Sequence, residues 1–319
     1  MAKIKALLLT EGMHGMISQV EGLAKSLDLN FKHHKVKLKK FWEFIPPKLT
    51  PISESILKEK FVFDSQIVIS CGRKSVVPSI ILKKKHKNNI FNIHIQDPKV
   101  SYSNFDLIIC PEHDGINGKN ILNTNGAIHY LTLQEIKKFS NYIKFEKEGK
   151  KIITFILGGP NKYYDFSEPQ LDKMFSKVKN SFTPDKHKII VIPSYRTPQN
   201  IIKMAYNSFS HDHIVIKEVD KKAYLSSLDL ADILVITCDS TSMISEAAIT
   251  GKPIYVGYMK TKRSNSRFRS FYDKFENMKI IKDLNLYQSG VDSWTYDEIN
   301  EVKRITPEIN ERMKKNGII

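Results

Sequence analysis

Short apolar runs alternate with longer amphipathic stretches along nearly the whole chain, and this alternation constrains the fold more than any other feature. Each run is continuously apolar, which is typical of strands covered on both faces of a parallel sheet. Strands separated by stretches of helical length indicate βαβ units. The expected strands are residues 4–10, 67–70, 91–95, 107–110, 152–157, 189–192, 214–216, 233–237 and 254–256. The expected helices are residues 17–27, 76–84, 168–179, 199–208, 222–230 and 242–250.

The alternation breaks once, in a polar, lysine-rich stretch at residues 138–151. A fresh apolar run, KIITFIL, follows, so we place a domain boundary at about residue 148. The predicted domains are residues 1–147 and 148–319, each a doubly wound Rossmann-type α/β domain, and together they would face a central cleft. A charged amphipathic helix expected at residues 296–315 could pack back across the first domain.

The net charge of +16 indicates an anionic partner, although the excess of lysine could equally reflect an AT-rich genome. A basic surface can attract nucleic acid or anionic lipid. No helix-turn-helix, zinc or RRM-like signature accompanies the charge, so we expect no nucleic-acid partner. An anionic membrane surface or an acidic phosphate substrate fits the charge better.

No apolar run approaches the roughly 20 residues that a membrane-spanning helix needs. The apolar stretch at residues 6–9 is also too short for the core of a signal peptide. We therefore expect a cytoplasmic protein, with peripheral attachment to the inner face of a membrane as the alternative. The three cysteines lack zinc-ligand spacing and suggest no disulfide framework.

The most informative segment is ILVITCDSTSMISEAAITGKP, residues 233–253. A hydroxyl-rich turn stands between an expected strand and an expected helix, where free N–H groups and the helix dipole favour a phosphate. Glu246 lies one turn beyond Ser242 and could accept hydrogen bonds from the two hydroxyls of a ribose. The alternative is a serine or threonine N-cap followed by a solvated glutamate. The predicted contacts here are Asp239, Ser240, Thr241, Ser242, Met243 and Glu246.

Two further loops follow expected strands of the second half, LGGPNKYY at residues 157–164 and IPSYRTP at residues 192–198. Paired glycines let the backbone approach a ligand closely. An arginine suits bidentate recognition of a phosphate. Either loop alone could be an ordinary turn, but the three loops together favour a nucleotide-sugar site. These loops add Gly158, Gly159, Asn161, Ser194, Arg196 and Thr197 to that site.

The first half carries polar residues at its own expected strand ends, which we assign to an acceptor. His14 or Asp97 would serve as the general base there. A structural or solvated role is the alternative for each residue. The glycines near His14 lack the complete GxGxxG spacing, so a dinucleotide fingerprint is absent. The acceptor-side candidates are Gly12, Gly15, Arg73, Gln96, Glu112 and His113.

The sequence contains neither an Asp-x-Asp pair nor a GxxxxGK[ST] motif. Many metal-dependent glycosyltransferases hold their ion with the former, and P-loop nucleotidases require the latter. We therefore expect no metal and no cofactor, with a nucleotide sugar as substrate.

The segment DSTSMISEAAITGKP is similar to the donor-binding motif of GT-B enzymes, in which a turn precedes a glutamate that holds the ribose. Six motifs in order resemble the mitochondrial-fission ELM family and its bacterial relatives, over about residues 1–280. They are SCGRKSVVPS, HIQDP, FDLIICPEHD, ILGGPN, SYRTP and CDSTSMISEA. Tyr195 departs from the pattern, because a second arginine is expected there. The resemblance implies a GT-B-like α/β fold.

Plant members of this family are implicated in mitochondrial fission through a dynamin-related partner, whereas bacterial members are described as glycosyltransferases or sugar-nucleotide epimerases without an established reaction. The leading hypothesis is a metal-independent glycosyltransferase that moves a sugar from a nucleotide-sugar donor to an unknown, lipid-linked or cell-envelope acceptor. The alternatives are a GT-B-type epimerase and a non-enzymatic fission-type adaptor.

A basic stretch with aromatic neighbours in the first half predicts contact with anionic lipid. The alternative is a solvated lysine face with buried aromatics. The stretch contains Lys32, Lys35, Lys37, Lys39, Lys40, Phe41, Trp42 and Phe44, and a second patch contains Lys83, Lys84, Lys85 and Lys87.

Overall fold

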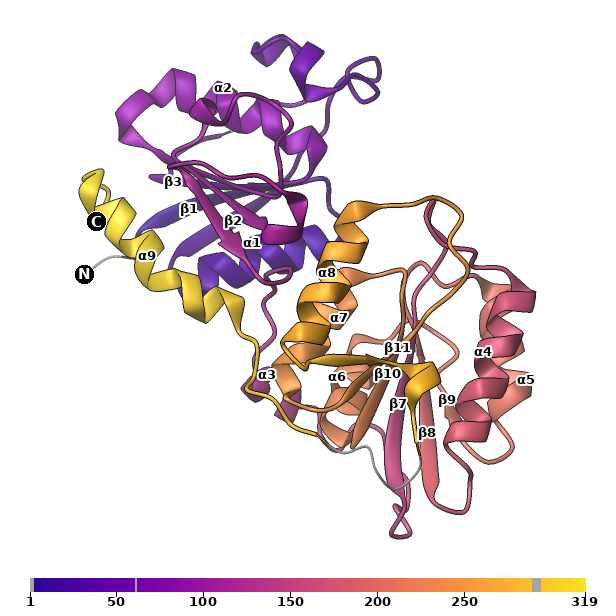
Figure 1. Cartoon of the computed structure of the whole chain (residues 1–319). Coiled ribbons are helices and arrows are strands. Elements are labelled where there is room, and N and C mark those ends of the chain that lie inside the picture. The colour runs from indigo at the N-terminus through magenta and orange to yellow at the C-terminus, as the bar shows by residue number, and fades with distance from the viewer. Residues whose placement is uncertain (1–2, 61, 289–293) are drawn as a thin grey trace. The chain divides into compact units, whose positions relative to one another are not determined.

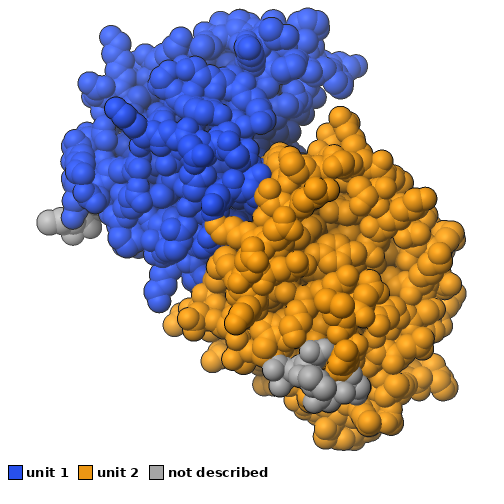
Figure 2. Space-filling model, in the orientation of Figure 1, with its two compact units in different colours: residues 1–130, 300–319 blue, residues 131–299 orange. Residues whose placement is uncertain are grey.

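The computed structural model describes residues 3–60, 62–288 and 294–319, and the chain forms two compact units (Figure 1). The first unit comprises residues 1–130 and 300–319, and the second comprises residues 131–299 (Figure 2). The boundary predicted near residue 148 therefore falls inside the second unit. The stretch before it contains α3 (Leu133–Lys137), which packs against α6 (Lys221–Leu230) of the same unit.

A six-stranded parallel sheet of order β2-β1-β3-β4-β5-β6 forms the centre of the first unit. The strands are β1 (Lys5–Thr10), β2 (Asn30–Lys35), β3 (Ile67–Cys71), β4 (Phe91–Ile95), β5 (Leu107–Pro111) and β6 (Ile121–Thr124). The α-helices are α1 (His14–Ser26), α2 (Val76–His86) and α9 (Glu301–Lys315). The 3-10 helices are η1 (Pro47–Leu49), η2 (Glu54–Ile56), η3 (Arg73–Ser75), η4 (Lys87–Asn89), η5 (Tyr102–Asn104) and η6 (Glu112–Asp114).

Alternate side chains of the central strands fill a separate apolar core on each face of this sheet. On β1, Ala6 and Leu8 pack in the core that contains the apolar residues of α1 and α9. Leu7 and Leu9 pack on the other face, in the core that contains the apolar residues of α2. Because successive side chains of a strand point to opposite faces, only a continuously apolar run can supply both cores.

The C-terminal helix α9 belongs to the first unit, to which both apolar and polar contacts fix it. Its residues Val302, Ile305 and Ile309 lie in the core beside α1. The buried carboxylate of Glu301 accepts hydrogen bonds from the backbone and side-chain amides of Asn125, at 3.0 and 2.7 Å. The last segment of the chain thus completes the core of the first unit.

The second unit repeats this architecture, with a parallel sheet of order β12-β11-β10-β7-β8-β9. Its strands are β7 (Lys151–Leu157), β8 (His187–Pro193), β9 (Ile214–Val215), β10 (Ile233–Thr237), β11 (Ile254–Gly257) and β12 (Ile281–Asp283). Its helices are α3, α4 (Glu168–Ser181), α5 (Gln199–Phe209), α6, α7 (Thr241–Ala247), α8 (Ser266–Asn277), η7 (Ala248–Thr250) and η8 (Leu284–Leu286). Across the described ranges, no helix combines the length and the apolar character needed to cross a membrane.

Candidate functional site

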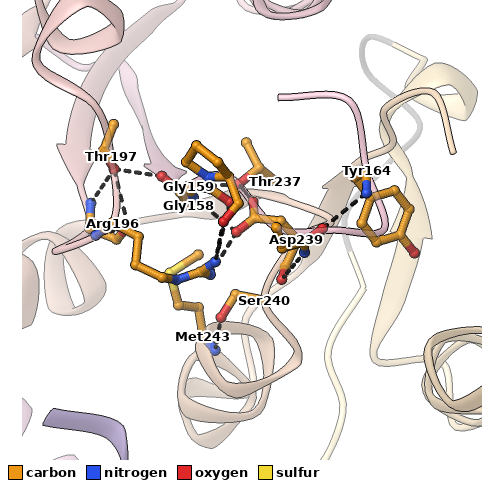
Figure 3. A network of polar contacts seen from close by, with 12 residues as sticks. Gly158, Gly159, Tyr164, Arg196, Thr197, Thr237, Asp239, Ser240 and Met243 are labelled. Carbon is orange, nitrogen blue, oxygen red and sulfur yellow. Dashed lines mark hydrogen bonds and ion pairs between the residues drawn. The ribbon is translucent and has the colours of Figure 1, made fainter. Parts of the chain in front are cut away.

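The three loops predicted to bind a nucleotide sugar come together at one edge of the second sheet. They follow β10, β7 and β8, which are adjacent strands in that order. Because the strands are parallel, their carboxyl ends lie at the same edge, and a network of polar contacts joins the loops there (Figure 3). The sheet order thus brings together residues that are far apart in the sequence.

Asp239 lies at the centre of this network, and its side chain is fully buried. Its carboxylate accepts hydrogen bonds from the Thr237 hydroxyl at 2.6 Å and the Gly159 N–H at 2.9 Å. It also pairs with the Arg196 guanidinium at 2.8 Å, so it touches all three loops (Figure 3). Burial raises the pKa of Asp239, although these donors oppose that effect. These contacts give Asp239 a positioning role in the network.

The two glycines after β7 lie where the loops approach one another closely. A Cβ on Gly158 would overlap the Asp239 carboxylate, and a Cβ on Gly159 would overlap the backbone carbonyl of Arg196. The Gly158 N–H also donates to the Thr237 hydroxyl at 2.8 Å. Packing between loops therefore requires glycine here, independently of any ligand.

Three more side chains of the β7 and β8 loops form hydrogen bonds within the network. The Asn161 amide donates to the Asp239 carbonyl at 3.1 Å, and its oxygen accepts from two backbone N–H groups of its own loop. The Thr197 hydroxyl donates to the Gly158 carbonyl at 2.6 Å, and the Ser194 hydroxyl accepts from the Arg196 N–H. These three residues therefore shape the site.

Arg196 is both anchored and accessible. Asp239 fixes its guanidinium, which also donates to the carbonyls of Gly159 and Pro160 at 3.2 and 3.3 Å. The side chain is nevertheless 39% exposed. A guanidinium held in place by a buried carboxylate can meet an anion with little loss of side-chain entropy.

The turn after β10 begins α7 with a serine N-cap, as the structural alternative predicted. The Ser240 hydroxyl accepts a hydrogen bond from the Met243 N–H at 3.5 Å. Thr241, Ser242 and Met243 are only partly buried. The first turn of α7 therefore remains accessible at the strand ends.

Glu246 is the titratable group of α7, and it is not simply solvated. Its carboxyl accepts a hydrogen bond from the Tyr224 hydroxyl of α6 at 3.1 Å. Burial is the largest influence on its pKa and raises it to about 7, although part of the residue stays exposed. Glu246 therefore changes charge near neutral pH and can either donate to or accept from a ligand hydroxyl.

The first-unit candidates lie after neighbouring strands of their own sheet, as predicted. His14 and Gly15 start α1 after β1 and are exposed, and Gly12 has a φ of 87°. Glu112 and His113 lie in η6 after β5, with Glu112 exposed and the His113 side chain buried.

Two other first-unit candidates are held by contacts inside the unit. The Arg73 guanidinium donates to the carbonyls of Ile45, at 2.9 Å, and Glu43. The Asp97 carboxylate is almost fully buried and accepts from both the backbone N–H and the ammonium group of Lys99. Gln96, which precedes Asp97, has a φ of 86°. Arg73 therefore stabilises the segment before β3, and Asp97 forms an ion pair with Lys99.

His94 of β4, another residue of the HIQDP motif, is fully buried, and its ring lies 2.8 Å from the Ser70 hydroxyl. Burial lowers the pKa of His94 to about 3, so its ring is neutral at physiological pH. His94 therefore serves the core of the first unit.

Sequence reasoning missed Thr237 and Tyr224, which support the two acidic residues of the site. Thr237 is the last residue of β10, and its position before the turn could have identified it. Tyr224 lies on α6, and its contact with Glu246 depends on how two helices pack, for which the sequence carries no local signal.

Comparison with known proteins identifies the family of the chain. The model of a family described as mitochondrial fission ELM1 matches residues 14–313. An uncharacterized protein of Rickettsia prowazekii, RP120, is 28% identical over 78% of this chain and 80% of its own length. The mitochondrial fission protein ELM1 of Arabidopsis thaliana is 21% identical over 79% of this chain, which spans 64% of that protein.

Solved structures of sugar-nucleotide enzymes share the fold. A UDP-N-acetylglucosamine 2-epimerase aligns with a TM-score of 0.59 and 15% identity, over 100% of this chain and 98% of that one. The Neisseria meningitidis enzyme bound to UDP-GlcNAc aligns with a TM-score of 0.56 and 12% identity, over 98% of this chain and 100% of that one. The glycotransferase of kitacinnamycin aligns with a TM-score of 0.53 and 11% identity, over 99% of this chain and 94% of that one. The predicted GT-B fold is thus confirmed, and the chain belongs to the mitochondrial fission ELM1 family.

Proposed function

We propose that this protein is a sugar-nucleotide enzyme of the GT-B type, and specifically a glycosyltransferase that needs no metal. Glu246 is the observation that carries the proposal. The carboxyl group of Glu246 has a pKa of about 7, accepts a hydrogen bond from Tyr224 and lies one helical turn beyond Ser242. It is therefore suited to bind the hydroxyls of a ribose.

The donor diphosphate would lie across the loops that the network joins. The accessible first turn of α7 supplies N–H and hydroxyl donors, and Arg196 supplies a fixed positive charge beside them. Such donors stabilise the charge that develops on a leaving diphosphate, which is the role that a metal ion plays in other transferases. The UDP-GlcNAc bound to the related-fold epimerase makes a uridine nucleotide the first donor to test.

The acceptor proton would pass to His14. Its exposed position at the start of α1 suits a general base better than the buried, lysine-paired carboxylate of Asp97. Gly12, Gly15, Gln96, Glu112 and His113 would then form the acceptor side, with the acceptor a lipid-linked or cell-envelope molecule.

Calorimetry with UDP, CDP, GDP and ADP tests the donor site. We expect one nucleotide to bind wild-type protein at least tenfold more tightly than Glu246→Ala, because the ribose loses its acceptor. Glu146→Ala, which changes an exposed glutamate of the same unit, should leave the affinity unchanged. Binding and turnover should survive EDTA. If no nucleotide distinguishes wild type from Glu246→Ala, the donor-site assignment is wrong.

A GT-B-type epimerase is the second candidate, because epimerases share this fold at the highest TM-score given above. An epimerase needs no second substrate. A change in the NMR spectrum of a nucleotide sugar without any acceptor would therefore favour epimerisation over transfer. A fission-type adaptor is the third candidate, and it predicts that none of the four nucleotides binds.

The first unit carries exposed aromatic and basic side chains that bear on where the protein works. Phe41 and Phe44 are 67% and 77% exposed, beside exposed Lys39 and Lys40. Trp42, in contrast, packs against the core of the first unit, so the predicted aromatic cluster is only partly at the surface. We propose that the two phenylalanines and the lysines around them contact an anionic membrane surface.

A further inference from the structure

The second unit contains a pocket that none of the proposed donor contacts uses. It has a volume of about 310 Å³ and lies between the loop after β7 and the segment that joins β11 to α8. Two buried tyrosines and two partly exposed ones line it, and two arginines lie among its exposed lining residues. The tyrosines are Tyr163, Tyr164, Tyr258 and Tyr272, and the arginines are Arg263 and Arg269.

The two walls of this pocket are tied together and to the donor network. The backbone N–H groups of Lys262 and Arg263 donate to the Tyr163 carbonyl, at 2.7 and 3.2 Å. The Tyr164 N–H donates to the Asn161 side chain, whose amide reaches the Asp239 carbonyl. Figure 3 shows Tyr164 on the opposite side of Asp239 from Arg196, with its ring directed away from the network. Hydrogen bonds therefore join the pocket to the adjacent donor site.

Hydrogen bonds also orient two of the tyrosine side chains. The Tyr272 hydroxyl donates to the Cys238 carbonyl, directly before the turn that contains Asp239. The Tyr258 hydroxyl donates to the Glu276 carboxylate at 3.1 Å. The rings of Tyr258 and Tyr272 meet edge to face, with centroids 5.1 Å apart. Fixed aromatic walls can bind a ring with little loss of conformational entropy.

Arginine is concentrated around this pocket. Only seven residues of the whole chain are arginine, yet three of them lie between Arg263 and Arg269. No acidic residue occurs between Gly257 and Asp273, whereas Lys260 and Lys262 add further positive charge. If this segment were basic only because the chain is rich in lysine, lysines should outnumber arginines here, as they do in the rest of the chain. Arginines instead indicate recognition of a planar or tetrahedral anion, which their guanidinium groups bind bidentately.

The remaining polar residues of the lining suit hydroxyl groups. The carboxylates of Asp273 and Glu276 can accept hydrogen bonds, and the side chain of Asn265 can both donate and accept. Aromatic faces, hydroxyl partners and guanidinium groups together match a polyhydroxylated ring with a negative substituent. The volume is at the small end of the roughly 300–1,000 Å³ of ligand pockets, which indicates a single ring.

We propose that this pocket binds an anionic monosaccharide, that is, one sugar ring carrying a carboxylate or a phosphate, with Arg263 and Arg269 holding the anion. The inference rests on the proposed function only for the choice of a sugar as the ring. It predicts that the enzyme's sugar or acceptor substrate carries a negative charge of its own.

Calorimetry with three free probes tests this proposal, and the probes are glucuronate, glucose 1-phosphate and glucose. We expect at least one charged probe to bind at least tenfold more tightly than glucose, and the one that binds identifies the anion. The double variant Arg263→Gln/Arg269→Gln should weaken that binding about tenfold or more. Arg267→Gln, which changes an arginine of α8 outside the pocket lining, should bind as wild type does.

Separate variants keep this result distinct from the donor site. Glu246→Ala should retain binding of the charged monosaccharide, and the double arginine variant should retain its thermal unfolding midpoint because both side chains are exposed. Nucleotide binding without any charged-probe binding would overturn the pocket assignment and leave the proposed function intact. Equal affinity for glucose and the charged probes, or an unaffected double variant, would also overturn it.

Discussion

At the scale of single residues, position 158 requires glycine because the Asp239 side chain packs directly against its backbone. Gly158→Ala would drive a methyl group into the buried carboxylate of Asp239. We expect the variant to lose roughly 2–3 kcal/mol of stability, because the carboxylate must move away from its donors. Urea unfolding, followed by tyrosine fluorescence, measures this. Gly15→Ala is the matched control, since a Cβ there meets nothing within 4 Å and α1 should gain helix propensity. Equal stability of the two variants would contradict the close approach.

Glu246 predicts a pH dependence of donor binding. A ribose hydroxyl donates to the ionised carboxylate, and a pKa of about 7 means that the ionised fraction rises about tenfold between pH 6 and pH 8. We therefore expect UDP-GlcNAc to bind about tenfold more tightly at pH 8 than at pH 6. This donor has no phosphate that titrates in the range. Glu246→Gln should give a flat profile, and a wild-type profile that is equally flat would exclude Glu246 as the ribose acceptor.

At the scale of elements, α9 closes the core of the first unit from the far end of the chain. Truncation after residue 299 would expose the apolar surface that Val302, Ile305 and Ile309 cover. We expect the truncated protein to aggregate or to bind the dye ANS, because that exposed core attracts other apolar surfaces.

Glu301→Gln is the milder test of the role of α9. It keeps the helix but weakens the charge-assisted bonds to Asn125, so the unfolding midpoint should fall by only a few degrees. Truncation without loss of solubility would contradict this role.

The elements also show what the sequence could predict and what it could not. Every predicted strand is present, since continuous apolar runs have few alternatives in a parallel sheet. The edge strand β2 was missed because NFKHHK has no apolar pattern, and its side chains are mostly exposed. The helix α8 was missed because its buried Phe271, Tyr272 and Phe275 are diluted by charged residues.

The meeting of the three loops at one edge of the second sheet was predictable for related reasons. Strand ends and turn residues located the three loops, because the carboxyl edge of a parallel sheet is fixed by topology. The roles of Asp239 and Asn161 were not predictable, since their partners come from loops about 80 residues apart, as the bonds to Gly159 and Asp239 show. The sequence thus predicts which loops meet, and tertiary contacts decide which of their side chains join the polar network and which remain accessible.

At the scale of the whole molecule, the charge of +16 and the exposed aromatics should act together. Long-range attraction brings a basic protein to an anionic surface and weakens as salt screens it. Burial of Phe41 and Phe44 would then add roughly 1.5–3 kcal/mol for each ring. We therefore expect sedimentation with anionic vesicles at low salt and release at high salt. Phe41→Ser/Phe44→Ser should lose most of this binding, whereas Tyr195→Ser, which removes a 77% exposed aromatic of the other unit, should not. Equal recovery with neutral and anionic vesicles would show that charge does not direct the protein to a membrane.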